Sequence, residues 1–154
     1  MAKTYNITTH SPEETQALAS RIGKAVNGGE VIELMSDVGA GKTTFVRGLV
    51  EGIGSTDAVA SPTFTISRVY GSEDLTIAHF DFYRLHEPGL IEHELSEYLD
   101  DRQVVTVIEW PDNIKHVLPK QRIKIHIKSD GKNERTFKFF VPGAYAYIEK
   151  ELEV

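Results

Sequence analysis

The 154-residue sequence contains no cysteine, so disulfide bonds and thiolate metal sites are excluded. It has no apolar run near the ~20 residues that cross a bilayer, and its first ten residues have no apolar signal core. An excess of positive charge is also lacking, since the formal net charge is -6. Counterion release at basic side chains supplies much of the affinity for nucleic acid. We therefore expect a cytoplasmic protein with neither membrane attachment nor strong direct nucleic-acid binding.

The remaining composition is that of an ordinary globular domain. Hydrophobic residues make up 40% and charged residues 26% of the chain, close to the averages for such domains. A chain of this length buries roughly 68–70% of its unfolded surface, which is enough for a conventional core. No repeat, low-complexity segment or linker divides it. The sequence predicts a single domain spanning residues 1–154.

One short segment, LMSDVGAGKTTF at residues 34–45, has the pattern of a phosphate-binding loop. The pattern G-x-x-x-x-G-K-[ST] is met by Gly41, Lys42 and Thr43, while Ser36 replaces the leading glycine. The run VIELM before it is typical of a buried parallel strand, and a helix is expected from about Lys42. A strand, a loop and a helix in this order form the context that the motif requires.

In such a loop, backbone N–H groups at the start of a helix surround phosphate oxygens. Lys42 would reach the outer phosphates and the Thr43 hydroxyl would bind Mg²⁺. Ser36 costs about 1–2 kcal/mol if its position needs a left-handed backbone, and nearly nothing if it is extended. The alternative interpretation is a Gly-Ala loop before an exposed lysine. The predicted nucleotide contacts in this segment are Asp37, Val38, Gly39, Ala40, Gly41, Lys42, Thr43 and Thr44.

Two carboxylates follow apolar runs that read as strands. Asp81 comes after TIAHF and Glu109 after VVTVI. Ligands of open α/β sheets bind beyond the carboxyl ends of the strands, and phosphoryl transfer needs carboxylates for metal and water. Helix capping or a surface ion pair is the alternative role for each. The candidate catalytic residues are Lys42, Asp81 and Glu109, and the candidate Mg²⁺ ligands are Thr43, Asp81 and Glu109.

Two weaker features bear on the same site. Ser61–Phe64 is first a turn signal, but in phosphate-loop switch proteins a threonine in this region senses the γ-phosphate, which makes Thr63 a candidate contact. The six histidines show no spacing with a carboxylate that would predict a zinc site. His79 lies two residues before Asp81 and therefore on the same face of the expected strand.

The remaining patterns complete an α/β domain. A capping box at residues 11–14 opens a helix, and buried strands alternate with helices. We predict a three-layer phosphate-loop NTPase domain with a mostly parallel central sheet and added antiparallel strands. The other expected elements are a strand at 4–9, a hairpin of 63–71 and 75–83, a helix at 88–99, a strand at 104–110, an antiparallel pair of 123–127 and 136–141, and a last short helix at 144–152.

Four segments in series, SDVGAGKTTF, SPTFT, HFDFYRL and IEWPD, resemble the hallmark segments of the TsaE (YjeE) family. These are small bacterial ATPases required for tRNA threonylcarbamoyladenosine synthesis. The resemblance covers nearly the whole chain and implies ATP and Mg²⁺ as cofactors. It also implies binding to a heterodimer of the sugar-kinase-like proteins TsaD and TsaB. TsaD transfers the threonylcarbamoyl group to tRNA, and ATP hydrolysis resets the complex between cycles.

The resemblance also implies roles for individual residues. Thr43 and Glu109 would contact Mg²⁺, Asp81 would act on water or metal, and Trp110 would lie close to the nucleotide or the partner. Ser61–Phe64 would be a switch-like loop. The other positions that it implies are His79, Tyr83 and Arg84 in the second motif, and adenine contacts at residues 9–11 and at Lys132 or Arg135, of which Ser11 and Lys132 are the candidates. Ser36 departs from the glycine common in the family.

Other functions compete with this interpretation. A phosphate-loop kinase for a small metabolite usually has an arginine-rich lid, whereas Arg47, Arg68 and Arg84 are scattered. A GTPase is disfavoured because the guanine-reading N-K-x-D motif does not occur. A nucleotide-gated binding module with incidental hydrolysis stays open. It would differ from an ATPase in that ATP binding alone would support the partner.

Overall fold

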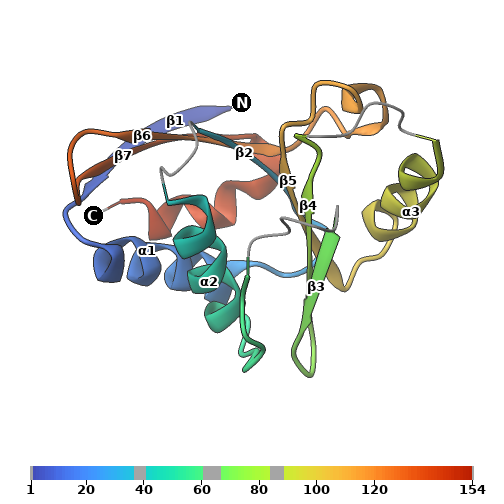
Figure 1. Ribbon diagram of the computed structural model, residues 1–154, viewed down its shortest axis with the longest axis horizontal. Coiled ribbons are helices and arrows are strands. Elements are labelled where there is room, and N and C mark those ends of the chain that lie inside the picture. Colours follow the sequence, from blue (N-terminus) through green and yellow to red (C-terminus); the bar gives the residue numbers. More distant parts are fainter. Residues whose placement is uncertain (1, 37–40, 61–66, 84–88, 154) are drawn as a thin grey trace.

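The structure, a computed structural model, describes residues 2–36, 41–60, 67–83 and 89–153. Helices and strands alternate along most of the chain (Figure 1). In chain order they are β1 (Lys3–Thr9), α1 (Pro12–Ala25), β2 (Val31–Ser36), α2 (Lys42–Gly52), β3 (Ser67–Gly71), β4 (Thr76–Asp81), α3 (Gly89–Leu99), β5 (Val104–Glu109), the 3-10 helix η1 (Lys115–Val117), β6 (Ile123–Ser129), β7 (Arg135–Val141) and the 3-10 helix η2 (Gly143–Glu151).

All seven strands form one sheet in the order β1-β7-β6-β2-β5-β4-β3. The four strands β6, β2, β5 and β4 run parallel to one another. Strand β7 is antiparallel to β6, β1 to β7, and β3 to β4. Strand β5 is buried along its whole length, whereas β6 and β7 alternate buried and exposed residues. This pattern matches a parallel centre with antiparallel additions.

The two faces of the sheet are covered to different extents. Helices α1 and α2 and the C-terminal η2 pack on one face (Figure 1), where the larger core cluster includes Phe45, Leu49 and Phe137. On the other face, a smaller cluster that includes Phe80, Leu95 and Ile114 joins β4 and β5 to α3 and to the segment around η1. The predicted α/β architecture is confirmed, and its third layer covers only part of the sheet.

Most predicted elements occur with small differences at their ends. The hairpin of β3 and β4 and the antiparallel pair of β6 and β7 are both present, although the start of the first predicted hairpin strand, residues 63–66, lies outside the described residues. The last helix is a 3-10 helix with a kink at Tyr145. Within the described ranges, no helix combines the length and apolar character needed to span a bilayer.

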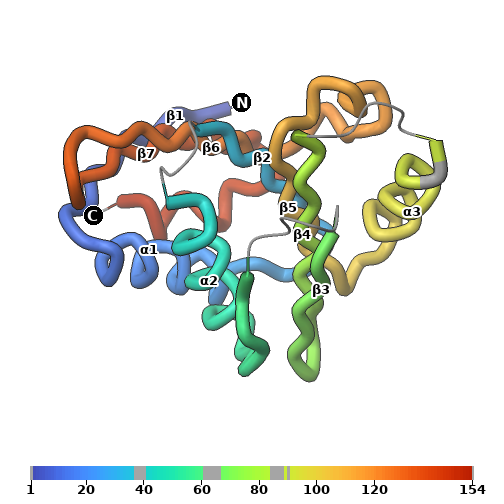
Figure 2. The backbone as a smooth tube through the Cα atoms, viewed as in Figure 1, coloured from blue at the N-terminus to red at the C-terminus, as the bar shows by residue number. Residues whose placement is uncertain are grey.

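Helix α1 begins as the sequence predicts. The Ser11 side chain accepts a hydrogen bond from the Glu14 N–H at 3.1 Å, which satisfies one of the free N–H groups of the first turn. Strand β1 precedes this helix and lies beside β7 at one edge of the sheet (Figure 2), so a segment near the start of the chain pairs with one near its end. The Tyr5 hydroxyl donates to Glu149 at 2.7 Å, which ties β1 to η2.

Strand β2 is held at its start by a buried carboxylate. Glu30 is fully buried, and it accepts the N–H groups of Asn27 and Gly28 at 2.7 Å each and the hydroxyl of Tyr147. A buried charge is tolerated when it is hydrogen-bonded in this way. The contacts fix the entry of the strand whose other end leads into the glycine-rich loop.

Helix α2 packs unusually close to α1 because glycines lie at the contact. A Cβ added at Gly48 would lie 2.4 Å from the Gln16 carbonyl oxygen and 2.6 Å from the Ala19 Cβ. Real Cβ atoms do not approach that closely, so Gly48 sets the distance between the two helices. Because Lys42 is the first residue of α2, this distance also bears on the position of that lysine.

We expect Gly48→Ala to lower the free energy of unfolding by roughly 1–3 kcal/mol, the usual cost of overpacking. Helix propensity alone predicts the opposite sign, a gain of about 1 kcal/mol from replacing glycine with alanine. Urea unfolding of Gly48→Ala beside Arg47→Ala, an exposed position on the same helix, separates the two effects. A more stable Gly48→Ala protein would show that the helices can move apart freely.

Candidate functional site

The carboxyl edge of the parallel strands gathers the polar residues that the sequence singled out. Strand β4 ends at Asp81 and β5 at Glu109, and these two residues are register partners on neighbouring strands. Strand β2, the other neighbour of β5, ends at Ser36, and α2 begins at Lys42. Side chains from three separate parts of the chain therefore lie at one edge of the sheet.

Glu109 is at the centre of this cluster. Its side chain is 5% exposed, and its Oε1 lies 3.1 Å from the Lys42 Nζ. Its Oε2 is hydrogen-bonded to His79 Nε2. Burial opposes ionisation of Glu109, but the hydrogen bond from His79 and the charge of Lys42 outweigh it, so the pKa lies below its usual value. Glu109 is therefore a carboxylate at neutral pH, with both oxygens oriented by partners.

His79 is almost completely buried, with 1% of its surface exposed. An ionised carboxylate only accepts hydrogen bonds, so His79 Nε2 is the donor to Glu109. The other ring nitrogen, Nδ1, is buried and has no hydrogen-bond partner among the residues that the structure describes. The sequence placed His79 beside Asp81 but did not pair it with Glu109, because that contact crosses between strands distant in sequence.

Asp81 differs from Glu109 in its surroundings. Its Oδ1 accepts the Tyr83 N–H at 3.0 Å. Burial raises the pKa of Asp81, and the negative charge of Glu109 adds to the rise, against lowering contributions from the Tyr83 N–H, Lys42 and His79. A carboxylate with a raised pKa takes up a proton more readily than an ordinary aspartate, which suits a group that would act on water.

Trp110, directly after β5, has a left-handed backbone with φ of 53°, and it is the non-glycine residue at positive φ in the described part of the chain. This conformation costs about 1–2 kcal/mol, and such strain concentrates at functional sites. The Trp110 ring lies 5.0 Å from the Tyr83 ring and 5.3 Å from Lys42 Nζ. No local sequence pattern predicts this conformation.

Two segments expected to contact adenine lie close to each other near the start of α2. Gly41 caps α2 with φ of 97°, and a Cβ there would lie 3.9 Å from Arg135 Nε. The end of β1 pairs with the start of β7, and His10 Nδ1 lies 3.5 Å from Glu134 Oε1. The segment around Ser11 and the hairpin that contains Lys132 are thus neighbours beside the start of α2.

Several predicted contacts lie outside the described residues, namely Asp37, Val38, Gly39, Ala40, Thr63 and Arg84. Thr43 and Thr44 are in the first turn of α2. Among the described residues, no three His, Asp or Glu side chains are grouped closely enough to hold a metal ion by themselves. Thr43, Asp81 and Glu109 stay the predicted Mg²⁺ ligands, and their hydroxyl and carboxylate oxygens are the kind of donor that Mg²⁺ prefers.

The backbone conformation of Ser36 decides whether the loss of the usual glycine at this position carries strain. Ser36 is the last residue of β2, paired in parallel register with Ile127, and its φ is not positive. The serine therefore occupies an ordinary extended backbone, so the replacement of the usual glycine carries no left-handed strain.

We expect Ser36→Gly to lower the free energy of unfolding by about 0.5–1 kcal/mol, because glycine loses more conformational freedom in a strand. The same change should leave nucleotide affinity within a factor of two or so. Thermal unfolding and titration with a fluorescent ATP analogue measure the two quantities. Markedly tighter nucleotide binding by Ser36→Gly would mean that serine weakens the loop after all.

The fold is that of an α/β protein with a parallel centre, and in such sheets ligands bind beyond the carboxyl ends of the strands, where this edge lies. The family model for "Threonylcarbamoyl adenosine biosynthesis protein TsaE" matches residues 9–137. The chain belongs to the TsaE family.

Individual relatives agree with this assignment. The chain is 41% identical over 145 residues to the tRNA threonylcarbamoyladenosine biosynthesis protein TsaE of Bacillus subtilis (strain 168), covering 94% of this chain and 90% of that protein. It is 40% identical over 115 residues to the TsaE of Streptomyces coelicolor, covering 71% and 76% of the two chains. The crystal structure of Bacillus subtilis YdiB superposes with a TM-score of 0.79 at 37% identity, covering 99% and 95%.

Proposed function

We propose that this protein is a Mg²⁺-dependent ATPase that supports tRNA threonylcarbamoyladenosine modification by binding a TsaD–TsaB heterodimer and resetting it through ATP hydrolysis. The observation that carries the proposal is the ion pair between Lys42, the first residue of α2, and Glu109, the last residue of β5. Membership of the TsaE family supplies the pathway. ATP phosphates at the start of α2 would meet both groups.

Each residue at the edge has a role in this proposal. The backbone at the start of α2 would hold the phosphates, and Lys42 would turn from Glu109 toward their outer oxygens. Thr43, Glu109 and Asp81 would hold Mg²⁺, which neutralises charge on the phosphates when bound. If Asp81 is instead free of the metal, its raised pKa suits it to orient the attacking water and accept its proton. His79 would keep Glu109 oriented through the hydrogen bond to Oε2.

The isolated protein should hydrolyse ATP slowly. Groups that a partner supplies in trans contribute ~10³–10⁵ to the rate in this kind of chemistry, and among the described residues Lys42 is the cation that the structure pairs with Glu109 at this edge. Addition of the heterodimer should then raise the hydrolysis rate. A chain that is already fast alone would contradict the proposed dependence on a partner.

The decisive experiment reconstitutes tRNA modification with purified TsaD and TsaB, with and without this protein. We expect several rounds of modification per heterodimer with ATP, and about one round with a non-hydrolysable analogue. Multiple rounds with the analogue would instead identify a nucleotide-gated binding module. No dependence on the added protein under any condition would overturn the proposed function.

A further inference from the structure

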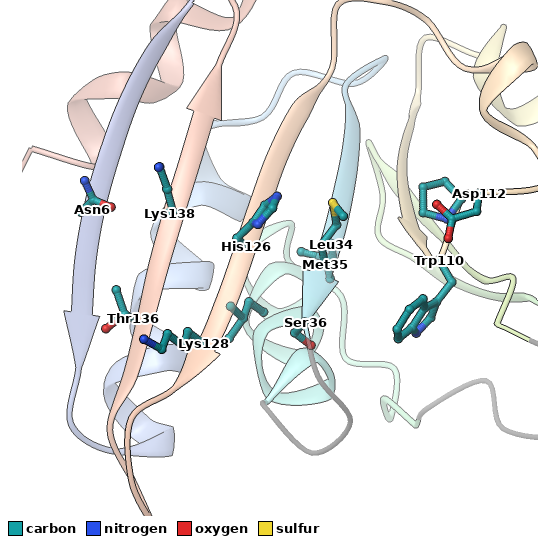
Figure 3. A pocket seen from close by; sticks show the side chains of 12 residues that line it. Asn6, Leu34, Met35, Ser36, Trp110, Asp112, His126, Lys128, Thr136 and Lys138 are labelled. Atoms are coloured by element: carbon teal, nitrogen blue, oxygen red, sulfur yellow. The ribbon is translucent and has the colours of Figure 1, made fainter.

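One face of the sheet carries a large uncovered area. Among the described residues, α3 and the segment around η1 pack on this face against β4, β5 and the start of β2 (Figure 1). Further along the same face, β1, β7, β6 and β2 present a row of side chains, several of which are labelled in Figure 3. The row contains Lys124, His126, Lys128 and Lys138, which we call the lysine face. His126, Lys128 and Lys138 are exposed, and Lys124 is half-buried.

The charge of the lysine face is opposite to that of the whole protein, whose formal net charge is -6. The carboxylate that β2 directs to this face is Glu33, which is buried and pairs with Arg122 at 3.1 Å. Lys128 lies 3.9 Å from Asp130, while within the described ranges Lys124 and Lys138 pair with no carboxylate. In the register of β6 and β7, Lys138 lies opposite His126, with Lys124 and Lys128 as its diagonal neighbours, and its Nζ lies 5.3 Å from the centre of the Phe140 ring. Three lysines are therefore concentrated on one side of this pair of strands.

A cavity of about 500 Å³ lies between this face and the loop that follows β5. Figure 3 shows Met35, His126 and Lys138 on the sheet and Trp110 and Asp112 across from them. Trp110 also faces Lys42 Nζ at 5.3 Å. The cavity thus combines apolar walls with a positive border, and one of its walls contacts the lysine of the candidate nucleotide site.

We propose that the lysine face and this cavity bind a protein partner through an acidic surface from which an aromatic or aliphatic side chain enters the cavity. The inference rests on the proposed function, in which the partner is the TsaD–TsaB heterodimer. An apolar anchor in a pocket with a polar border is the usual anatomy of a protein–protein contact. Contact at Trp110 would let the partner respond to whether Lys42 is engaged with phosphate.

Nucleic acid fits this surface less well. Proteins that bind duplex DNA tightly neutralise about 6–10 phosphates, whereas the lysine face offers three lysines, one of them already beside Asp130. The carboxylate of Asp112 also borders the cavity and would repel a phosphate backbone. An acidic protein surface can place its carboxylates opposite the lysines and away from Asp112, so the Asp112 carboxylate does not prevent it from binding.

The test is a double charge reversal, Lys128→Glu with Lys138→Glu, assayed for binding to the purified TsaD–TsaB heterodimer by sedimentation velocity or surface capture. We expect the affinity to fall about tenfold or more, with a smaller dependence on salt than in the wild type. The control reverses Lys24 and Lys150, two exposed lysines on α1 and η2, and should bind as the wild type does. Nucleotide affinity of the isolated chain should be the same in all three proteins.

The outcomes distinguish this inference from the proposed function. If the wild type binds the heterodimer and the Lys128/Lys138 variant binds equally well with the same salt dependence, the lysine face is not the docking surface, although the proposed function stands. If the wild type does not bind the heterodimer, both proposals fail. Binding of the wild type to tRNA alone, lost in the Lys128/Lys138 variant, would assign the face to RNA and overturn the protein-docking proposal.

Discussion

Lys42→Ala should reduce ATP hydrolysis in the presence of the heterodimer by about 10²–10³, the usual loss when one preorganised charge is removed from a developing anion. In the structure the Lys42 Nζ lies 3.1 Å from Glu109 and next to the Trp110 ring. The group is thus held at the carboxyl edge of the sheet before nucleotide arrives. Steady-state phosphate release, measured over a range of ATP concentrations, separates lost binding from lost turnover.

The matched control is Lys24→Ala, which removes an exposed lysine from α1. Lys42→Ala must also be shown to unfold cooperatively, because it leaves the buried Glu109 carboxylate with His79 as its remaining partner, and an uncompensated buried charge is destabilising. A folded Lys42→Ala protein that hydrolyses ATP at the wild-type rate would remove Lys42 from the site.

Glu109→Gln should lower the turnover number by a similar factor of about 10²–10³ while nucleotide affinity changes little. The substitution keeps the size of the side chain but removes the charge that would hold Mg²⁺. Hydrolysis should therefore respond more weakly to added Mg²⁺ than in the wild type.

Asp81→Ala should likewise retain nucleotide and lose turnover. Unchanged turnover in both carboxylate variants would refute the roles given to them.

The loss of stability caused by Glu109→Gln should depend on pH in a definite direction. Because the folded-state pKa of Glu109 is lowered, its ionised form stabilises the fold above the unfolded pKa of about 4.3. That contribution is lost as the pH falls through the lower folded value. The stability difference between wild type and Glu109→Gln should therefore shrink in acid. A difference that grows as the pH falls would contradict the lowered pKa.

The sequence predicted the local features of the site because local patterns encode them. The continuous apolar run before Glu109 indicates a fully buried strand, and a rule for parallel sheets places the ends of such strands at one edge. That argument placed Asp81 and Glu109 correctly at the ends of β4 and β5. It could not show that these strands are neighbours, because strand order depends on contacts between distant segments.

Three features could not be predicted for the same reason. The hydrogen bond between His79 and Glu109 joins two strands that are distant in sequence. The left-handed backbone of Trp110 depends on the residues around it. Alternation in β6 and β7 shows that one face is polar, but it cannot tell which face the helices cover. The residues IKIHI indicated one polar face. Only the arrangement of α1, α2 and η2 shows that Lys124, His126 and Lys128 belong to the open side.

The position of β2 in the sheet has a consequence for synthesis of the protein on the ribosome. Strand β2, made early, lies between β5 and β6, and β1 pairs with β7, whose residues 135–141 are among the last to be made. At about 5–20 residues per second, the N-terminal third of the chain waits on the order of ten seconds for these neighbours. Until β5 and β6 are made, the nascent chain contains Lys42 but lacks the sheet edge at which Lys42 meets Glu109. ATP binding should begin only after the chain is nearly complete, so that truncated products would not compete for the partner.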